Sequence, residues 1–267
     1  MEKVTARKLM KMKGRQKIAM VTAYDYFSAR IVDEAGVDAI LVGDSLGMVV
    51  LGLRNTLGVT MDDMVRHTEA VARAQPRALV VGDMPFLSYE IDLREAVVNA
   101  GRLAAAGADA VKLEGGEEFA DRVRAIVRAG IPVMGHIGLT PQRYLRLGGY
   151  RLVGKKPGEA EELLRDAEAL QEAGVFAIVI EHTVPEVAEM VTRKIEVPTI
   201  CIGAGPGCDG QVLVFHDLLG LNPEPPYFAK RYADLAGIIR EAVARYVEEV
   251  RSGVFPGEEY SPPPKKH

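Results

Sequence analysis

Short apolar runs recur along the whole chain, and longer stretches in which apolar positions follow a helical period separate them. Apolar runs rich in β-branched residues and bounded by glycine or polar residues are typical of buried strands. We predict eight strands, at Ile18–Thr22, Ala39–Val42, Ala78–Val81, Ala110–Leu113, Pro132–Gly135, Phe176–Ile180, Pro198–Ile202 and Gln211–Phe215.

The segments between these runs are predicted to be amphipathic helices. In "MDDMVRHTEAVARAQ", Met64 and Val71 share one helical face, and Thr60 with Asp63 predicts a capping box at the start. Four helix ends resemble one another, as "EAGVDAI", "AAGADAV", "RAGIPVM" and "EAGVFAI". The glycine in each stands where a helix C-cap favours a left-handed residue, and the next strand follows at once. These four glycines are Gly36, Gly107, Gly130 and Gly174.

Strands that alternate with helices predict a parallel sheet with helical crossovers. Eight such units in about 250 residues match the usual size of a (β/α)8 TIM barrel. A doubly wound open sheet is the alternative fold. No internal linker interrupts the pattern, so we predict a single barrel domain over 1–267, with a short N-terminal helix and an extended C-terminal tail, "SPPPKKH".

Composition excludes several classes of protein. The net charge is −4 and the isoelectric point is about 5.8, so a nucleic-acid-binding surface is not indicated. An apolar run of about 18 residues, as a membrane helix needs, does not occur. The basic N-terminal segment lacks the apolar core of a secretory signal. The chain holds only Cys201 and Cys208, so we predict neither a disulfide framework nor a zinc site, and a reducing cytoplasm as the location.

Acidic residues close four of the predicted strands. Asp44 and Asp83 each follow a Val-Gly pair, Glu114 closes "AVKLE", and Glu181 closes "FAIVIE". Active sites of (β/α)8 barrels lie at the carboxyl ends of the strands, so the four side chains are expected on one rim. Such carboxylates without sulfur ligands favour a hard cation such as Mg²⁺. The alternative is that each acid caps the following helix or pairs with an arginine.

Two further polar residues lie near the same rim. Lys112 stands one alternate position before Glu114 and therefore points to the same side of its strand. It is either a charged lysine or a Schiff-base nucleophile, and its acidic neighbours favour the charged form. His136 ends a strand and either contacts the substrate or serves only the scaffold.

Six segments together resemble the signature segments of the ketopantoate hydroxymethyltransferase family. In chain order they are "VTAYDYFSAR", "VGDSLGM", "GDMPF", "VKLEGG", "GHIGLTPQ" and "GAGPGCDGQVLVFHDLLG". They extend from Val21 to Gly220. The resemblance implies a (β/α)8 barrel of the phosphoenolpyruvate- and pyruvate-binding type. It also implies a large homo-oligomer, with a decamer as the expected form, that acts on small molecules in pantothenate synthesis.

The same resemblance implies an aldol-type transfer of a one-carbon unit from 5,10-methylenetetrahydrofolate to α-ketoisovalerate, which gives ketopantoate and tetrahydrofolate. It implies that Asp44, Asp83 and Glu114 hold Mg²⁺, directly or through water. Ser45 and Lys112, together with Asp44 and Asp83, would contact the keto acid. We predict His136 as a further contact from its position at a strand end. Glu181 would be the general base. The "GAGPG" turn would shape the folate side of the site.

Two other functions remain open from the sequence. One is a Mg²⁺-dependent carbon–carbon lyase of the same barrel superfamily. The other is a catalytically silent barrel that serves as a binding or assembly module. A silent barrel would be expected to have lost at least one of Asp44, Asp83, Glu114 and Glu181, and all four are present.

Overall fold

The structure is a computed structural model that describes residues 2–263. It divides into two compact units, 1–215 and 216–267. The prediction of one domain over 1–267 therefore stays a prediction, and part of the predicted C-terminal tail lies outside the described residues. Within the described residues, no helix is long and apolar enough to cross a membrane.

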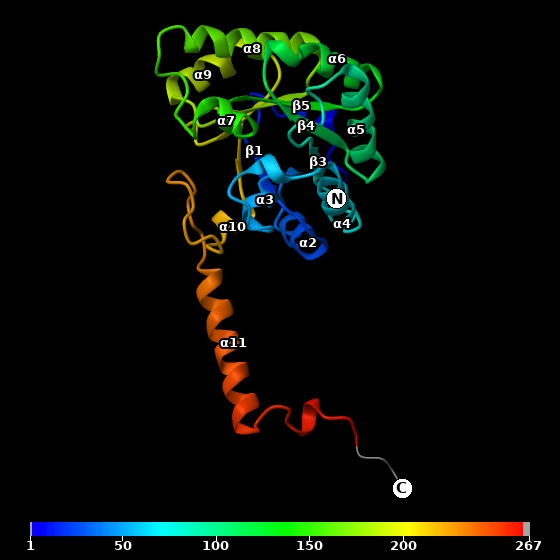
Figure 1. Ribbon diagram of the computed structural model, residues 1–267, viewed down its shortest axis with the longest axis vertical. Coiled ribbons are helices and arrows are strands. Elements are labelled where there is room, and N and C mark those ends of the chain that lie inside the picture. The colour runs from blue at the N-terminus through cyan, green and yellow to red at the C-terminus, as the bar shows by residue number, and fades with distance from the viewer. Residues whose placement is uncertain (1, 264–267) are drawn as a thin grey trace. The chain divides into compact units, whose positions relative to one another are not determined.

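Eight parallel strands close into a barrel in the order β1 to β8, so the predicted fold is confirmed. Helices surround the strands in the first unit (Figure 1). The strands are β1 (Ile18–Thr22), β2 (Ala39–Val42), β3 (Leu79–Asp83), β4 (Ala110–Glu114), β5 (Val133–Gly138), β6 (Ala177–Glu181), β7 (Thr199–Ile202) and β8 (Gly210–Leu213).

The α-helices are α1 (Ala6–Met10), α2 (Tyr26–Glu34), α3 (Leu46–Val49), α4 (Met61–Ala72), α5 (Leu93–Ala105), α6 (Ala120–Arg128), α7 (Tyr144–Leu147), α8 (Glu159–Ala173), α9 (Pro185–Lys194), α10 (Phe215–Leu218) and α11 (Leu235–Ser252). Four 3₁₀ turns are also described, η1 (Thr56–Gly58), η2 (Glu117–Phe119), η3 (Pro141–Arg143) and η4 (Glu258–Tyr260).

Local signals in the sequence produce the predicted helix boundaries. Thr60 and Asp63 form the expected capping box at the start of α4. Gly36, Gly107, Gly130 and Gly174 all have positive φ, between 92° and 102°. These left-handed residues end the preceding helices and turn the chain directly into β2, β4, β5 and β6.

Several strand ends differ from the prediction. The strand β3 continues past Val81, because Gly82 and Asp83 pair with Val111 and Lys112 of β4. In the same way β5 continues to Gly138. At the end of the barrel, β8 stops at Leu213, and the Phe215 N–H donates a hydrogen bond to Thr22 Oγ1 as α10 begins. Backbone pairing therefore extends into polar residues that an apolar run does not include.

Two apolar layers build the barrel. The outer layer lies between strands and helices, and the inner layer fills the barrel interior. Val4 and Leu9, from the N-terminal segment, belong to the inner cluster, and Leu9 of α1 is fully buried. The predicted short N-terminal helix therefore contributes to the barrel interior.

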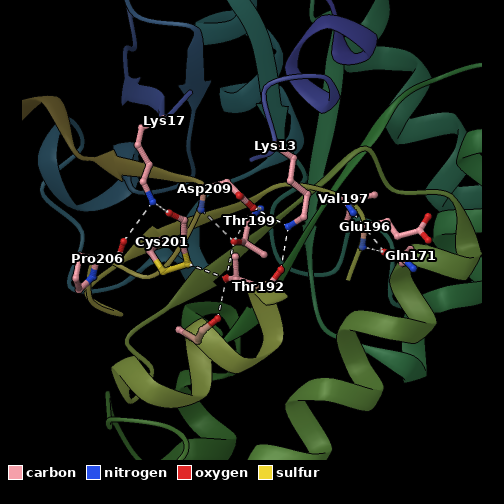
Figure 2. Close-up of polar contacts among 12 residues, drawn as sticks. Lys13, Lys17, Gln171, Thr192, Glu196, Val197, Thr199, Cys201, Pro206 and Asp209 are labelled. Carbon is pink, nitrogen blue, oxygen red and sulfur yellow. Dashed lines mark hydrogen bonds and ion pairs between the residues drawn. A yellow bond between two sulfur atoms is a disulfide. The ribbon is translucent and has the colours of Figure 1, made fainter. Parts of the chain in front are cut away.

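The two cysteines form a single disulfide, which the sequence analysis did not predict. Cys201 lies in β7, Cys208 lies in the loop that follows, and both are buried. Gly203 and Gly205, with φ of 63° and 80°, let this loop turn back, so the two Cα atoms lie 5.7 Å apart, within the usual range for a disulfide. Figure 2 shows the bond beside Lys17, which donates to the Cys208 carbonyl. The two cysteines therefore give no support to a reducing location.

The second unit contains α11, an 18-residue helix that begins after the N-cap Asp234 and ends at the left-handed Gly253. No residue of this helix is buried. Its apolar side chains Ile238, Val243 and Tyr246 are each more than half exposed.

Candidate active site

The register of the barrel brings the predicted site residues together at the carboxyl ends of the strands. Asp83 pairs with Lys112 across β3 and β4, Glu114 pairs with His136 across β4 and β5, and Gly138 pairs with Glu181 across β5 and β6. Asp44 follows β2 and Ser45 is the N-cap of α3. All of the predicted side chains except Ser45 and Glu181 are buried.

Asp83 forms the closest ion pair of the site, with its Oδ1 2.8 Å from Lys112 Nζ. Its Oδ2 accepts a hydrogen bond from the Asp44 N–H at 3.1 Å. Burial and the neighbouring Asp44 together raise the pKa of Asp83 to about 7, against the attraction of Lys112. The Asp83 carboxyl therefore depends on nearby positive charge to stay ionised.

Lys112 is a charged lysine. Burial alone would lower its pKa, but the carboxylates of Asp83, Glu114 and Asp44 outweigh burial and raise the pKa above its ordinary value. A lysine that never gives up its proton is a poor nucleophile, so the Schiff-base alternative is not supported.

His136 connects the lysine to the acid at the end of β6. The Lys112 ammonium donates to His136 Nδ1 at 3.1 Å, since a charged lysine has no acceptor. This contact assigns the ring proton to Nε2, which lies 3.2 Å from Glu181 Oε2. Burial and the Lys112 charge lower the pKa of His136 well below its ordinary value, so the ring is neutral at pH 7.

Glu181 is the most accessible acid of the predicted site, with 19% of its side chain exposed. Burial raises its pKa to about 7, while Lys112 and His182 act in the opposite direction. A carboxyl group with a pKa near neutrality, at the edge of a site and beside a neutral histidine, has the properties of a general base.

Gln142 and Tyr89 complete the site, and the sequence analysis did not single them out. Gln142 Nε2 donates to Asp44 Oδ2 at 2.9 Å, and its backbone N–H donates to Glu114 Oε2 at 3.0 Å. The Tyr89 hydroxyl contacts Gln142 Oε1 at 2.7 Å and the Glu114 backbone. The available signal was that Gln142 ends the quoted segment "GHIGLTPQ". Similarly, Tyr24 lies in "VTAYDYFSAR", and its hydroxyl lies 2.8 Å from Ser45 Oγ.

The donor set fits a hard divalent cation. Asp44, Asp83, Glu114 and Glu181 bring four carboxyl groups to one rim. Lys112 pairs with Asp83 there, and His136 contributes no charge because its ring is neutral. Burial and mutual repulsion raise the pKa of Glu114 well above its ordinary value. Among residues 2–263, no group of three His, Cys, Asp or Glu side chains converges as a preformed metal centre. One or two carboxylates with water and substrate oxygens is the usual arrangement for Mg²⁺, which these residues match.

A cavity of about 190 Å³ lies beside this site, between the loops after β4 and β5 and the start of α8. Its lining includes Gly115, Arg143, Arg151 and Asp166. Arg143 pairs with Glu118 and Arg151 with Glu159, so these arginine charges are already balanced. None of the predicted site residues is among the residues that line this cavity. The cavity is therefore separate from Asp44, Asp83, Glu114 and Glu181, which we call the acid cluster.

A closed parallel barrel whose strand ends carry buried carboxyl groups, a charged lysine and a neutral histidine defines an enzyme of the (β/α)8 class. The sequence profile of the family described as ketopantoate hydroxymethyltransferase matches residues 3–258. The chain therefore belongs to the ketopantoate hydroxymethyltransferase family.

Curated relatives support the same assignment. A protein of Hyperthermus butylicus named 3-methyl-2-oxobutanoate hydroxymethyltransferase is 67% identical over 96% of this chain and 90% of its own length. A protein of the same name from Sulfurisphaera tokodaii is 64% identical over 97% of this chain and 98% of its own length.

Solved structures of other enzymes share the fold. A 2,3-dimethylmalate lyase, described as a member of the PEP mutase/isocitrate lyase superfamily, aligns with a TM-score of 0.63 at 21% identity over 97% of this chain and 92% of that one. A phosphoenolpyruvate phosphomutase from Streptomyces platensis aligns with a TM-score of 0.64 at 20% identity, with the same coverage of both chains. These likenesses show that the chain shares the (β/α)8 fold of those enzymes.

Proposed function

We propose that this chain transfers a hydroxymethyl group to 3-methyl-2-oxobutanoate, the α-keto acid also called α-ketoisovalerate, as the names of its relatives indicate. The donor is 5,10-methylenetetrahydrofolate. The C3–H bond of the keto acid and the two bonds that join the donated carbon to folate nitrogens break, and a bond from C3 to that carbon forms. Water supplies the hydroxyl group, and its other proton and the C3 proton end on the two folate nitrogens. The products are 2-dehydropantoate (ketopantoate) and tetrahydrofolate, and the reaction belongs to pantothenate synthesis.

The observation that carries this proposal is the position of Glu181. This acid stands at the edge of a rim of buried carboxyl groups, 3.2 Å from the Nε2 atom of a neutral histidine. Removal of a proton next to a ketone needs a base of near-neutral pKa and a site that stabilises negative charge on oxygen. The pKa of Glu181, about 7, suits that base.

We assign the divalent cation to Asp44 and Asp83, with Glu114 contributing directly or through water. Bound Mg²⁺ would supply Lewis-acid stabilisation of the enolate oxygen. Asp44 and Asp83 would hold it, since both are buried and joined by the hydrogen bond from the Asp44 N–H. Lys112 favours the ionised form of Asp83 through the 2.8 Å ion pair.

The remaining residues orient the keto acid. Lys112 offers a permanent positive charge to an anionic substrate, and Ser45 offers a hydroxyl held by Tyr24 at 2.8 Å. His136 lies beside the base, with its Nε2 atom 3.2 Å from Glu181 Oε2. Glu181 takes the C3 proton, and its partial exposure lets the proton leave to water.

We propose further that the protein works in the cytoplasm on small soluble substrates and assembles into a homo-oligomer, with a decamer as the expected form. Light scattering would test this assembly by comparing the mass of the particle in solution with the chain mass of 29.0 kDa. A monomer at micromolar concentration would contradict the assembly but not the chemistry, because each barrel carries its own rim of acids.

The activity is tested by incubating the purified protein with 3-methyl-2-oxobutanoate, 5,10-methylenetetrahydrofolate and Mg²⁺ and following ketopantoate by NMR. We expect product only when both substrates are present, loss of product after chelation, and recovery on addition of Mg²⁺. Cleavage of ketopantoate or a related acid without any requirement for folate would instead identify a lyase. Full activity in protein stripped of metal would overturn the cation assignment.

A further inference from the structure

Gln142 forms hydrogen bonds with residues at the ends of three other strands of the site. It lies in η3, just after β5, and only 2% of it is exposed. Its side chain reaches Asp44 after β2 and the Met84 carbonyl after β3, each at 2.9 Å. Its backbone N–H reaches Glu114 of β4 at 3.0 Å. One residue therefore ties together the ends of four successive strands.

The orientation of the Gln142 amide is determined by its neighbours. Nε2 faces a carboxylate oxygen and a carbonyl oxygen, both of which can only accept. Oε1 faces the Tyr89 hydroxyl at 2.7 Å, which donates. A flipped amide would place oxygen against two acceptors and its NH₂ against the hydroxyl, so only the observed orientation satisfies all three contacts.

These contacts hold the carboxylates of Asp44, which follows β2, and Glu114, which ends β4. The strand between them, β3, carries Asp83. The bond from Nε2 to Asp44 Oδ2 sets the plane of the Asp44 carboxylate and so directs its second oxygen. The bond from the Gln142 N–H to Glu114 Oε2 acts in the same way on Glu114, whose Oε1 lies 3.6 Å from His136 Nδ1. Without these donors, two buried carboxylates that repel each other would have fewer contacts to define their rotamers.

We propose that Gln142, held by Tyr89, is the positioning residue that orients Asp44 and Glu114 for the divalent cation. The proposal rests on the cation site of the proposed function and assigns to Gln142 no contact with either substrate. Outer partners of metal-binding carboxylates typically contribute about 10-fold to 100-fold to metal affinity. We expect the loss of the Gln142 amide to weaken cation binding within this range.

The test measures the affinity for Mn²⁺ alone, without either substrate, by electron paramagnetic resonance titration of the full chain. Gln142→Met keeps the length of the side chain and the backbone N–H but removes the amide. We expect its dissociation constant for Mn²⁺ to rise by about 10-fold to 100-fold. An unchanged constant would overturn the proposal.

Gln171→Met is the matched control. Gln171 Oε1 in α8 accepts hydrogen bonds from the Glu196 and Val197 N–H groups at 2.6 and 3.3 Å (Figure 2). None of these three residues belongs to the acid cluster. The same substitution there removes hydrogen bonds of a similar kind. We expect a lower melting temperature with unchanged Mn²⁺ affinity. A Gln171 variant that loses as much Mn²⁺ affinity as Gln142→Met would contradict the proposal, because the effect would then be general.

Tyr89→Phe decides the matter should Gln142→Met fail to fold. This variant retains the ring and its edge-to-face contact with Phe119 and removes only the hydroxyl that holds Gln142. We expect a several-fold weaker affinity for Mn²⁺, and wild-type affinity would count against the proposal. A wild-type protein that binds no Mn²⁺ also overturns it, whereas failure of the transferase reaction with intact Mn²⁺ binding would reject only the proposed function.

Discussion

The two halves of the barrel interior are made by the same strands and the same strand faces, yet they differ completely in chemistry. In the amino half, one apolar cluster includes Val81, Ala110, Met134 and Val179. Two residues further along those strands, the inward positions are Asp83, Lys112, His136 and Glu181. Inward-facing positions recur every second residue. From one inward position to the next on each of these strands, the interior therefore changes from apolar side chains to ionisable ones.

This difference separates the source of stability from the source of chemistry. The apolar half is filled with side chains that need no hydrogen-bond or ion-pair partner. Their close packing stabilises the closed barrel. In the ionisable half, burial raises the pKa values of Asp83, Glu114 and Glu181, so the charged forms of these groups are held at a cost in free energy. Changes in one half should therefore leave the main property of the other half intact.

Among changes to the residues assigned to the cation, the largest effect on function is expected from Asp83→Asn. The amide cannot carry the charge that pairs with Lys112 at 2.8 Å and that would hold the cation. Loss of this electrostatic stabilisation should lower turnover by about 10²-fold to 10³-fold, as measured by ketopantoate formation at saturating Mg²⁺. If Asp83 only capped a helix, the variant would lose about 1 kcal/mol of stability and keep its turnover.

A second effect concerns pH and the metal-free protein. The folded-state pKa of Glu181 is raised from 4.5 to about 7, so the folded protein keeps a proton that the unfolded chain has already released. Unfolding then releases protons, and the free energy of unfolding falls as pH rises from about 4.5 to about 7. The loss is on the order of 3 kcal/mol for this group alone.

Urea unfolding at several pH values measures this slope. Excess Mg²⁺ should reduce it, because a bound cation stabilises the ionised acids. The Glu181→Gln variant serves as the control, since it should lack the contribution of this group in metal-free protein. A wild-type slope of opposite sign across this range would contradict the account of the ionisable half.

The smallest effect is expected in the apolar half. Ile200 in β7 is fully buried in the inner cluster, and Ile200→Val removes one methylene from it. We expect a loss of about 1 kcal/mol in the free energy of unfolding, with turnover per folded molecule unchanged. A large fall in turnover at this distance from the acids would show that the two halves are not separable.

Much of the fold could be predicted from sequence because its signals are local. Apolar runs in the sequence indicated all eight strands. Gly36, Gly107, Gly130 and Gly174 indicated the helix ends, because glycine adopts positive φ without steric cost. The strand-end position of Asp83 followed from the same pattern. Its pairing with Lys112 required the register of β3 with β4, which no local signal gives.

The features that were missed depend on the paths of loops. Gln142 meets Asp44 across 98 positions of sequence and Met84 across 58, and nothing near Gln142 indicates either contact. The Cys201–Cys208 disulfide depends on a turn through Gly203 and Gly205 that brings two nearby cysteines face to face. A count of two cysteines could exclude a framework of several bridges but not this single bond.

The most direct test of the central claim is exchange of the C3 proton of 3-methyl-2-oxobutanoate with deuterated solvent, measured by NMR in the wild type and in Glu181→Gln. The wild type should exchange this proton in the presence of Mg²⁺ without the folate donor. The variant, whose amide keeps the size of the side chain and leaves Asp44, Asp83 and Glu114 unchanged, should bind the keto acid normally. General-base catalysis contributes about 10² to 10⁴ in rate, so both its exchange and its turnover should fall by that factor. Retained exchange in Glu181→Gln would assign the base to water or another residue and contradict the account.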